Sequence, residues 1–331
     1  MKKATITSRS LFCLLGIFTQ TGFWNIMKAS EGGIFMKEAL LYDKLPDGSV
    51  KCGLCFRKCL IPDKKRGHCG VRENREGTLY ALTYGLADAI QIDPIEKKPL
   101  YHFMPGTKTY SIGSMGCNLF CRWCQNHELS QNPKPDKPVI GHNVTPIDHV
   151  KMAKRYGCPS ISYTYSEPTV WLEYALETMK LAKEAGLANI WVTNGEMSYE
   201  ALEKILPTLD AANVDLKSIR DDVFRAYCGG DVESVLSNVK TMKKAGIHLE
   251  VTTLVVPGVN DSDSELTKMA NFIAEKLGKD TPWHISRFFP AWRMDEGEPT
   301  PATTLKRARA IGENAGLENI HIGNIREWEM N

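Results

Sequence analysis

Three cysteines with a short, uneven spacing are the residues of this chain best suited to chemistry. They lie in the run Gly116-Cys117-Asn118-Leu119-Phe120-Cys121-Arg122-Trp123-Cys124, with the spacing C-x3-C-x2-C. A [4Fe–4S] cluster has four irons that each need an outside ligand, so three thiolates leave one iron open. An open iron can bind a small molecule and act on it. The spacing therefore predicts a catalytic iron–sulfur cluster, with a structural zinc site or a redox-inert loop as the alternative.

A second group of cysteines precedes the first, in the pattern Cys52-x2-Cys55-x3-Cys59-x9-Cys69. Four thiolates suit a closed site, which would hold either structural zinc or an auxiliary iron–sulfur cluster. Nearby basic residues would stabilise the thiolates. A nucleic-acid-binding zinc ribbon is disfavoured, because only one Cys-x2-Cys knuckle is evident and aromatic residues for base stacking are sparse.

The composition limits the class of protein. A chain of 331 residues can bury a sizeable core, and its net charge of +2 gives no reason to expect a nucleic-acid partner. Seven of the ten cysteines fall in the two groups with metal-ligand spacing, which argues against a disulfide scaffold. Thiolates that hold iron need a reducing compartment, so we expect a cytoplasmic protein.

The first 35 residues differ from the rest of the chain. A basic start, Met1-Lys2-Lys3, is followed by a mostly apolar stretch over residues 11–24 that is too short to span a bilayer as a helix. Polar residues at 19–21 interrupt it, no small-x-small cleavage site follows, and Met36 resembles a domain start. We expect residues 1–35 to be a leader, a disordered extension or an upstream start-codon artefact without stable membrane association. A working signal or anchor is the alternative.

From residue 139 onward, short apolar runs alternate with amphipathic helices, which indicates a parallel α/β sheet. Three expected helices end in Ala-Gly before a strand, and Thr145-Pro146 and Ser262 mark the starts of others. About seven strands are too few for a closed eight-fold barrel, so we expect a partial (β/α)6-type parallel barrel over residues 106–325. Residues 36–105 would form a small cysteine-rich N-terminal subdomain, and residues 326–331 a short tail. The expected strands cover residues 109–113, 160–165, 189–193, 212–216, 248–256, 283–288 and 319–322.

Polar residues follow several of these strands. Ligands of parallel α/β proteins bind beyond the carboxyl ends of the strands, where the first cysteine run is also expected. Glu167 and Ser166 end one strand, Asn194 follows the next, and Asp215 and Lys217 lie two apart on a third. Each of these has a purely structural alternative. Glu167 could interact with a helix macrodipole, Asn194 could belong to a simple βα turn, and Asp215 and Lys217 could lie on a solvated strand edge.

The cysteine run resembles that of the radical S-adenosylmethionine (radical SAM) superfamily, in which the amino and carboxylate groups of S-adenosylmethionine occupy the open iron. Tyr165-Ser166-Glu167-Pro168 resembles the Gly-Gly-Glu motif of that superfamily with both glycines replaced. The resemblance implies that Glu167 accepts hydrogen bonds from the methionyl amine.

Thr193-Asn194-Gly195 and Asp215-x-Lys217 are similar to segments of pyruvate formate-lyase-activating enzymes, in which this lysine meets the methionyl carboxylate. An arginine of those enzymes aligns with Thr252, and Arg287 is a candidate to replace it. His284 would either face the substrate or lie in the core.

Residues 93–99 (Asp-Pro-Ile-Glu-Lys-Lys-Pro), taken together with the segments above, make residues 36–325 look like the radical SAM enzyme of the AmmeMemoRadiSam system. That resemblance implies reductive cleavage of S-adenosylmethionine, Memo-like and AMMECR-like partner proteins, and a flavodoxin- or ferredoxin-type electron donor. The alternatives are a glycyl-radical activating enzyme and a non-catalytic iron–sulfur or zinc scaffold. The substrate does not follow from any of these observations.

Overall fold

The computed structural model describes residues 36–134 and 137–326. The expected leader, residues 1–35, lies outside this range, as does nearly all of the expected tail. Within the described residues, no helix is both long enough and apolar enough to cross a membrane.

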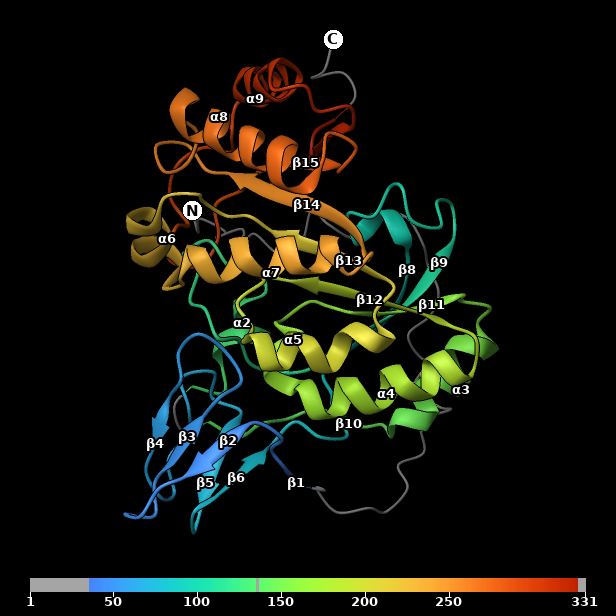
Figure 1. Cartoon of the computed structure of the whole chain (residues 1–331), viewed down its shortest axis with the longest axis vertical. Helices are drawn as coiled ribbons and strands as arrows, with labels where there is room; N and C mark the ends of the chain where they lie inside the picture. Colours follow the sequence, from blue (N-terminus) through green and yellow to red (C-terminus); the bar gives the residue numbers. More distant parts are fainter. Residues whose placement is uncertain (1–35, 135–136, 327–331) are drawn as a thin grey trace, which may run out of the picture. The chain divides into compact units, whose positions relative to one another are not determined.

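An eight-stranded sheet carries the fold, in the order β16-β15-β14-β13-β12-β11-β9-β8 (Figure 1). Seven neighbouring strands are parallel, as the repeat of strands and helices predicts, and the sheet ends in different strands at its two edges, so it forms a partial barrel. The parallel strands are β9 (Lys108–Gly113), β11 (Ser160–Tyr163), β12 (Ala188–Thr193), β13 (Ala211–Asp215), β14 (His248–Val255), β15 (Trp283–Arg287) and β16 (Ile320–Gly323).

The eighth strand was not expected. β8 (Ala89–Pro94) pairs antiparallel with β9 at one edge of the sheet, although it belongs to the segment expected to form the N-terminal subdomain. Its residues do not alternate cleanly between apolar and polar, so the period-2 signal of a strand is weak.

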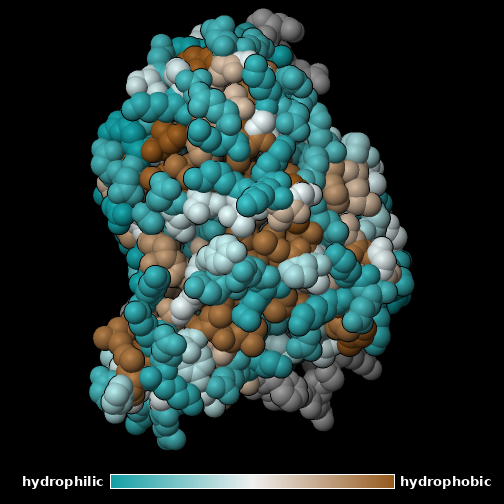
Figure 2. Space-filling model, viewed as in Figure 1, coloured by the Kyte–Doolittle hydropathy of each residue, from teal (hydrophilic) through white to brown (hydrophobic). Residues whose placement is uncertain are grey.

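Helices cover the outer face of the sheet (Figure 1). On the side seen in Figure 2 their outer surfaces are mostly hydrophilic, and hydrophobic residues gather between them, as expected of amphipathic helices packed on a sheet. The helices are α2 (His127–Gln131), α3 (Pro146–Arg155), α4 (Leu172–Glu184), α5 (Tyr199–Ile205), α6 (Asp221–Cys228), α7 (Val232–Lys244), α8 (Asp263–Phe272) and α9 (Ala302–Asn314). The 3-10 turns are η1 (Ile95–Lys97), η2 (Pro168–Trp171) and η3 (Leu206–Thr208), and η4 (Ile273–Leu277) is a π-helical turn.

The helix ends form largely as predicted. Thr145 caps α3 by accepting a hydrogen bond from the backbone of Asp148, and the glycines that follow α4, α7 and α9 are left-handed. At α8, the Ser262 side chain accepts a hydrogen bond from the backbone of Glu265, as in a capping box. In a complete capping box the Glu265 carboxylate would accept a bond from the Ser262 backbone in return, but here it has other partners. The Glu265 carboxylate instead accepts from the Ser218 hydroxyl and from the Ile219 backbone, both in the loop after β13.

Short strands make up the N-terminal region. One three-stranded antiparallel sheet consists of β1 (Lys37–Glu38), β6 (Thr78–Ala81) and β5 (Arg72–Arg75), and another of β2 (Tyr42–Lys44), β3 (Val50–Cys52) and β4 (Leu60–Ile61). A third pair joins β7 (Leu86–Ala87) to β10 (His142–Asn143). Such small sheets have little core of their own, so their stability depends on packing against the rest of the chain.

A buried ion pair joins this region to the parallel barrel. The guanidinium of Arg72, on β5, lies 2.5 Å from the carboxylate of Glu173, on α4, and each side chain is 1% exposed. The same carboxylate also accepts a hydrogen bond from the backbone of Leu40. Loss of one partner would leave the other charge buried and unpaired, which typically costs 3–5 kcal/mol.

We therefore expect Glu173→Gln to lower the free energy of unfolding by about 3 kcal/mol. Glu184→Gln, at the exposed end of the same helix, is the control and should change the free energy of unfolding by less than about 0.5 kcal/mol. Urea unfolding followed by circular dichroism measures both values. Equal, small effects of the two substitutions would show that the ion pair does not fasten the N-terminal region.

Candidate functional site

A cavity of about 370 Å³ opens at the carboxyl ends of the parallel strands. Eight of the nine residues expected at the first cluster and its cofactor line it, drawn from the cysteine run and from the ends of three neighbouring strands. These residues are Cys117, Cys121, Cys124, Ser166, Glu167, Asn194, Asp215 and Lys217. The sequence-based expectation that these separate segments meet at one edge of the sheet is thus met by the structure.

The cysteine run has no regular structure and is held by its neighbours. On one side the backbones of Phe120 and Arg122 donate hydrogen bonds to the carbonyls of Cys228 and Tyr227, at the end of α6. On the other side Gly116 (φ +99°) lies so close to the N-terminal region that a Cβ there would be 2.8 Å from Val71 and 3.0 Å from the Cys69 carbonyl. Only glycine combines this backbone angle with this approach.

The three thiols line one cavity and can each bind one iron of a [4Fe–4S] cluster. Among the described residues, no group of three or more His, Cys, Asp or Glu is arranged to hold one metal ion. A cube is different, because each thiolate binds its own iron and the sulfurs can stand further apart. Burial raises the pKa of Cys117 and Cys124, so the thiolates need a bound cation to form.

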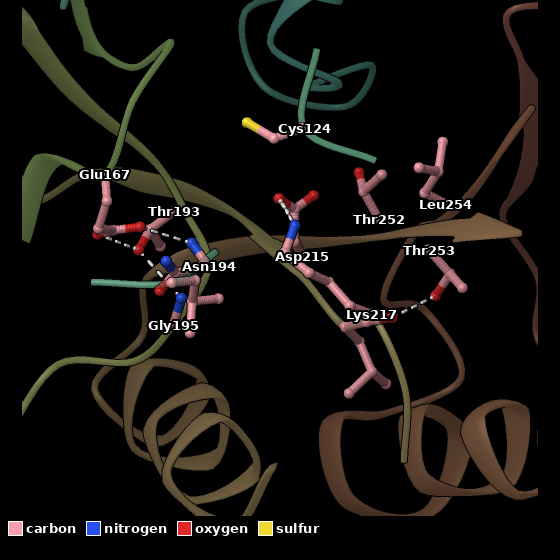
Figure 3. Close-up of polar contacts among 12 residues, drawn as sticks. Cys124, Glu167, Thr193, Asn194, Gly195, Asp215, Lys217, Thr252, Thr253 and Leu254 are labelled. Carbon is pink, nitrogen blue, oxygen red and sulfur yellow. Dashed lines mark hydrogen bonds and ion pairs between the residues drawn. The ribbon is translucent and has the colours of Figure 1, made fainter. Parts of the chain in front are cut away.

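Glu167 is fully surrounded by donors (Figure 3). One carboxylate oxygen accepts from the backbone and hydroxyl of Thr169 and from the Thr193 hydroxyl, and the other accepts from the Asn194 backbone at 2.9 Å. Burial raises the pKa of Glu167, and these hydrogen bonds oppose the rise. The residue therefore caps η2, as the alternative interpretation proposed, and also ties the end of β11 to the end of β12 beside the cavity.

The loop before Glu167 keeps a glycine-like shape. Tyr165 stands where the resemblance places a glycine, and its φ of +68° lies in the left-handed region that glycine adopts without cost. Its hydroxyl donates to Asp93, and the Lys98 ammonium lies 4.4 Å from the centre of its ring. These contacts hold the strained residue in place, so a tyrosine occupies a backbone conformation that glycine usually adopts.

Lys217 is a cation at the same edge, and its side chain is 14% exposed. Its ammonium lies 2.7 Å from Asp215, the last residue of β13 (Figure 3). The neighbouring Val214 and Leu216 are buried. Burial alone would lower the pKa of Lys217, but Asp215 and the thiol of Cys121 raise it above its ordinary value. Lys217 is therefore charged at neutral pH and able to bind an anionic group.

Asn194 connects this edge to the cysteine run. Its side-chain amide donates to the Asn118 side chain at 2.8 Å and lies 3.8 Å from the sulfur of Cys117. The Asn118 amide in turn donates to the carbonyl of Glu196. The Thr-Asn-Gly turn therefore holds the cysteine loop through hydrogen bonds and also forms part of the cavity wall.

Arg287 and His284 lie elsewhere. Arg287 is not among the residues that line the cavity, and its guanidinium donates to the Thr300 carbonyl. His284 lies near the start of β15, buried 2.6 Å from the Glu250 carboxylate, which also binds His248 and the backbones of Tyr101 and His102. Its place is therefore the core at the amino end of the strands.

Three residues near the cavity were not expected from their sequence positions. Lys97 and Lys98 line it, and both pair with Asp93; Lys98 is 3% exposed. Cys228 ends α6, and its carbonyl accepts a hydrogen bond from the backbone of Phe120 in the cysteine run. The charged run at 93–99 was a signal for the lysines, but a glycine-flanked lone cysteine gave no indication of a partner more than 100 residues away.

Comparison with known proteins identifies the family. A model of the radical SAM superfamily matches residues 111–270. The uncharacterized protein MJ0808 of Methanocaldococcus jannaschii is 44% identical over 88% of this chain and 86% of its own length. The chain belongs to the radical SAM superfamily. The pyruvate formate-lyase-activating enzyme of Clostridium pasteurianum is 25% identical over 51% of this chain and 70% of that protein, so this superfamily member is related to activating enzymes.

Solved structures agree with the radical SAM fold. SuiB of Streptococcus suis bound to S-adenosylmethionine has a TM-score of 0.52 at 14% identity, over 65% of this chain and 49% of that one. A radical SAM methyltransferase from Sphaerobacter thermophilus has a TM-score of 0.52 at 16% identity, over 66% and 67%. Membership of the superfamily implies a [4Fe–4S] cluster and S-adenosylmethionine, which the three cysteines and the cavity beside them can accommodate.

Glu196 gives a pH-dependent prediction next to this site. Burial raises its pKa from 4.5 to about 8, and one carboxylate oxygen has no partner among the described residues. The protonated form is thus favoured in the folded state, so its stabilising effect is complete below about pH 4.5 and is lost as the pH rises through 8.

Glu196→Gln cannot titrate, so we expect wild type to lose stability relative to this variant between pH 5 and 9, by up to about 4 kcal/mol. Melting curves of both proteins across this range measure the difference, and Glu200→Gln, at an exposed position on α5, should follow wild type. Parallel curves for wild type and Glu196→Gln would contradict the prediction.

Proposed function

We propose that this protein is a radical SAM enzyme that reductively cleaves S-adenosylmethionine and abstracts a hydrogen atom from a substrate within the AmmeMemoRadiSam system. When bound, the cluster and S-adenosylmethionine supply the electron transfer and the 5′-deoxyadenosyl radical. The observation that carries the proposal is that Cys117, Cys121 and Cys124 share one cavity with Glu167, Asn194 and Lys217.

The residues of the cavity have distinct roles in this proposal. The three thiolates hold the cluster, and Lys217 holds the methionyl carboxylate with a charge that Asp215 keeps in place at 2.7 Å. Glu167, Ser166 and Asn194 form the opposite wall, where the Glu167 carboxylate orients the loop that meets the methionyl amine. Burial of the Glu167 carboxylate, which is 2% exposed, strengthens its hydrogen bonds.

Membership of the AmmeMemoRadiSam system is supported by residues 93–99. This run lies at the cavity, since Lys97 and Lys98 line it and Asp93 binds both lysines and Tyr165. In addition, the activating enzyme of C. pasteurianum matches 51% of the chain, so about half of the chain has no counterpart in that match. The proposal includes Memo-like and AMMECR-like partners and a flavodoxin- or ferredoxin-type electron donor in the cytoplasm, where thiols stay reduced.

Two further features belong to the proposal. Cys52, Cys55, Cys59 and Cys69 line a common cavity and would bind a second metal centre, zinc or iron–sulfur. Arg287 does not line the cavity, whereas Lys217 does, so we assign the carboxylate to Lys217.

Cysteine replacement tests the chemistry. In anaerobically reconstituted protein reduced with dithionite, we expect 5′-deoxyadenosine from S-adenosylmethionine, and its loss by more than about 100-fold in Cys121→Ala, because the cluster loses a ligand. Cys158→Ala, a buried cysteine outside both groups, is the control and should retain activity. If Cys121→Ala forms as much 5′-deoxyadenosine as wild type, the assignment of the cluster to these cysteines is wrong. If wild type binds an intact cluster but forms no 5′-deoxyadenosine, a non-catalytic scaffold is favoured.

The choice between partners is tested in the same assay. Addition of Memo-like and AMMECR-like proteins should increase consumption of S-adenosylmethionine and yield a modified small product. A glycyl-radical signal in an added glycyl-radical enzyme, measured by electron paramagnetic resonance, would instead establish the activating-enzyme alternative.

Binding of S-adenosylmethionine tests Lys217 separately. Lys217→Met should raise the dissociation constant by about 10- to 100-fold, since a hydrogen bond to a charged group contributes about 1.5–3 kcal/mol. Lys217→Arg should recover part of this loss, and Lys151→Met, on an exposed part of α3, should have no effect. Equilibrium dialysis with the reconstituted protein measures the constants; equal binding by Lys217→Met and wild type would remove this residue from the site.

A further inference from the structure

Two lysines that have no role in the proposed function line the cofactor cavity. Lys97 and Lys98, in the segment between β8 and β9, form part of the same wall system as the cysteine run and Lys217. Lys217 is already assigned to the methionyl carboxylate, and Asp215 holds it at 2.7 Å. The cavity therefore has a second source of positive charge that S-adenosylmethionine does not explain.

The segment of these two lysines lies close to the group that Lys217 forms with Asp215. The Pro99 carbonyl, next to Lys98, accepts a hydrogen bond at 2.8 Å from the Asn213 side chain. Asn213 and Asp215 lie two residues apart on β13, so their side chains share one face of the strand, about 6.6 Å apart along it. The backbone beside Lys98 is thus separated from the cofactor site by no more than the length of a small molecule.

One carboxylate serves both lysines. Asp93 lies 3.3 Å from the ammonium of Lys97 and 2.7 Å from that of Lys98. In the part of the chain that the structure describes, neither lysine forms an ion pair with another carboxylate. The neighbouring Glu96 carboxylate accepts a hydrogen bond from the Gly106 backbone and does not line the cavity. Two ammonium groups against one carboxylate leave an excess of one positive charge.

Lys98 is a nearly buried ammonium with hydrogen-bonding capacity to spare. Its side chain is 3% exposed, and an ammonium has three N–H donors. Among the described residues, one donor bonds to Asp93, and the ring of Tyr165 lies 4.4 Å from the nitrogen. Leaving a buried donor without an acceptor is costly, so an acceptor supplied by a ligand in the cavity would be favourable.

The ionisation of Lys98 points the same way. Burial lowers the pKa of Lys98, and the Asp93 carboxylate opposes this shift. A second anion beside the ammonium would favour its charged form further. The surroundings of Lys98 are therefore better suited to a bound anion than to a neutral ligand.

An oxyanion is the ligand group that fits these observations. Carboxylate and phosphate oxygens accept strong hydrogen bonds from ammonium groups and would balance the excess positive charge. A glycine residue of a partner protein presents only neutral backbone groups around its reacting carbon, and these would leave that charge unbalanced. The lysine pair thus favours a charged small molecule over the main chain of a protein.

We propose that the substrate is a small molecule with a carboxylate or phosphate group, which Lys97 and Lys98 bind in the cavity beside S-adenosylmethionine. This inference rests on the proposed function and adds the substrate class to it. Asp93 is a positioning residue in this assignment, because it holds both ammonium groups. Lys217 and the lysine pair then bind the anionic groups of two different molecules.

Anion binding without turnover tests this proposal. The full chain is reconstituted anaerobically, saturated with S-adenosylmethionine in the absence of a reductant, and titrated with inorganic phosphate or with acetate in a calorimeter. Wild type should bind at least one of these probes saturably. Lys98→Met should weaken that binding by about 10-fold or more, because a hydrogen bond to a charged group is lost. Lys108→Met, at an exposed position on β9, is the control and should bind as wild type does.

The affinity for S-adenosylmethionine separates anion binding from a structural role of Lys98. The proposal expects Lys98→Met to change that dissociation constant by less than about 3-fold. It is overturned if the variant weakens both ligands equally, if it weakens neither, or if wild type binds neither probe. A preference for phosphate or for acetate then shows which oxyanion the substrate carries.

A second variant covers the case in which Lys98→Met does not fold. The Lys97 side chain is 70% exposed, so its replacement leaves no buried charge without a partner. Lys97→Met should weaken the binding of the same probe by about 3-fold. Unchanged binding by this variant would remove Lys97 from the site.

These outcomes are separate from those of the proposed function, because the titration needs no reductant and no cleavage. A protein that binds the anion through Lys98 but forms no 5′-deoxyadenosine contradicts the proposed function. A protein that forms 5′-deoxyadenosine but binds neither anion contradicts the substrate class alone.

Discussion

A loop without regular secondary structure must hold three sulfurs in fixed positions, and the rest of the structure around the site follows from this constraint. The loop cannot position itself, since few of its backbone groups bond to one another. Instead α6 supplies carbonyls on one side, and the N-terminal region supplies the surface against which Gly116 packs on the other. The Arg72–Glu173 ion pair then keeps that region against α4. The small antiparallel sheets are therefore part of the catalytic scaffold, although they contribute no residue to the parallel sheet's carboxyl edge.

Much of the parallel sheet was predictable, because its signals are local. Short apolar runs, Ala-Gly helix ends and the Thr145 cap each depend on a few adjacent residues, and the structure places them within a residue or two of expectation. The same holds for Cys117, Glu167 and Lys217, since the carboxyl ends of parallel strands necessarily meet at one edge.

Other features depend on contacts that no local pattern encodes. β8 pairs with β9 because of the turn between them, Glu265 turns from its own helix to the loop after β13, and His284 meets a glutamate on the neighbouring strand. Tyr165 adopts a glycine-like conformation only because Asp93 and Lys98 hold its ring from another part of the chain. In each case a tertiary contact decides between two locally acceptable states.

The segment that joins β8 to β9 also supplies part of the wall of the cavity. Its residues Ile95 and Leu100 are buried in the core against Ile190 and Ala211, near the amino ends of β12 and β13, and the Pro99 carbonyl accepts from Asn213. Asp93, which holds Lys98 and Tyr165, lies opposite Thr109 near the start of β9. Lys98 thus lines the cavity from the segment between β8 and β9, whereas Glu167 and Lys217 line it from the loops after β11 and β13. The cavity is therefore lined by lysines from two separate parts of the chain, Lys97 and Lys98 from this segment and Lys217 from the end of β13, so anionic groups can be bound from two sides.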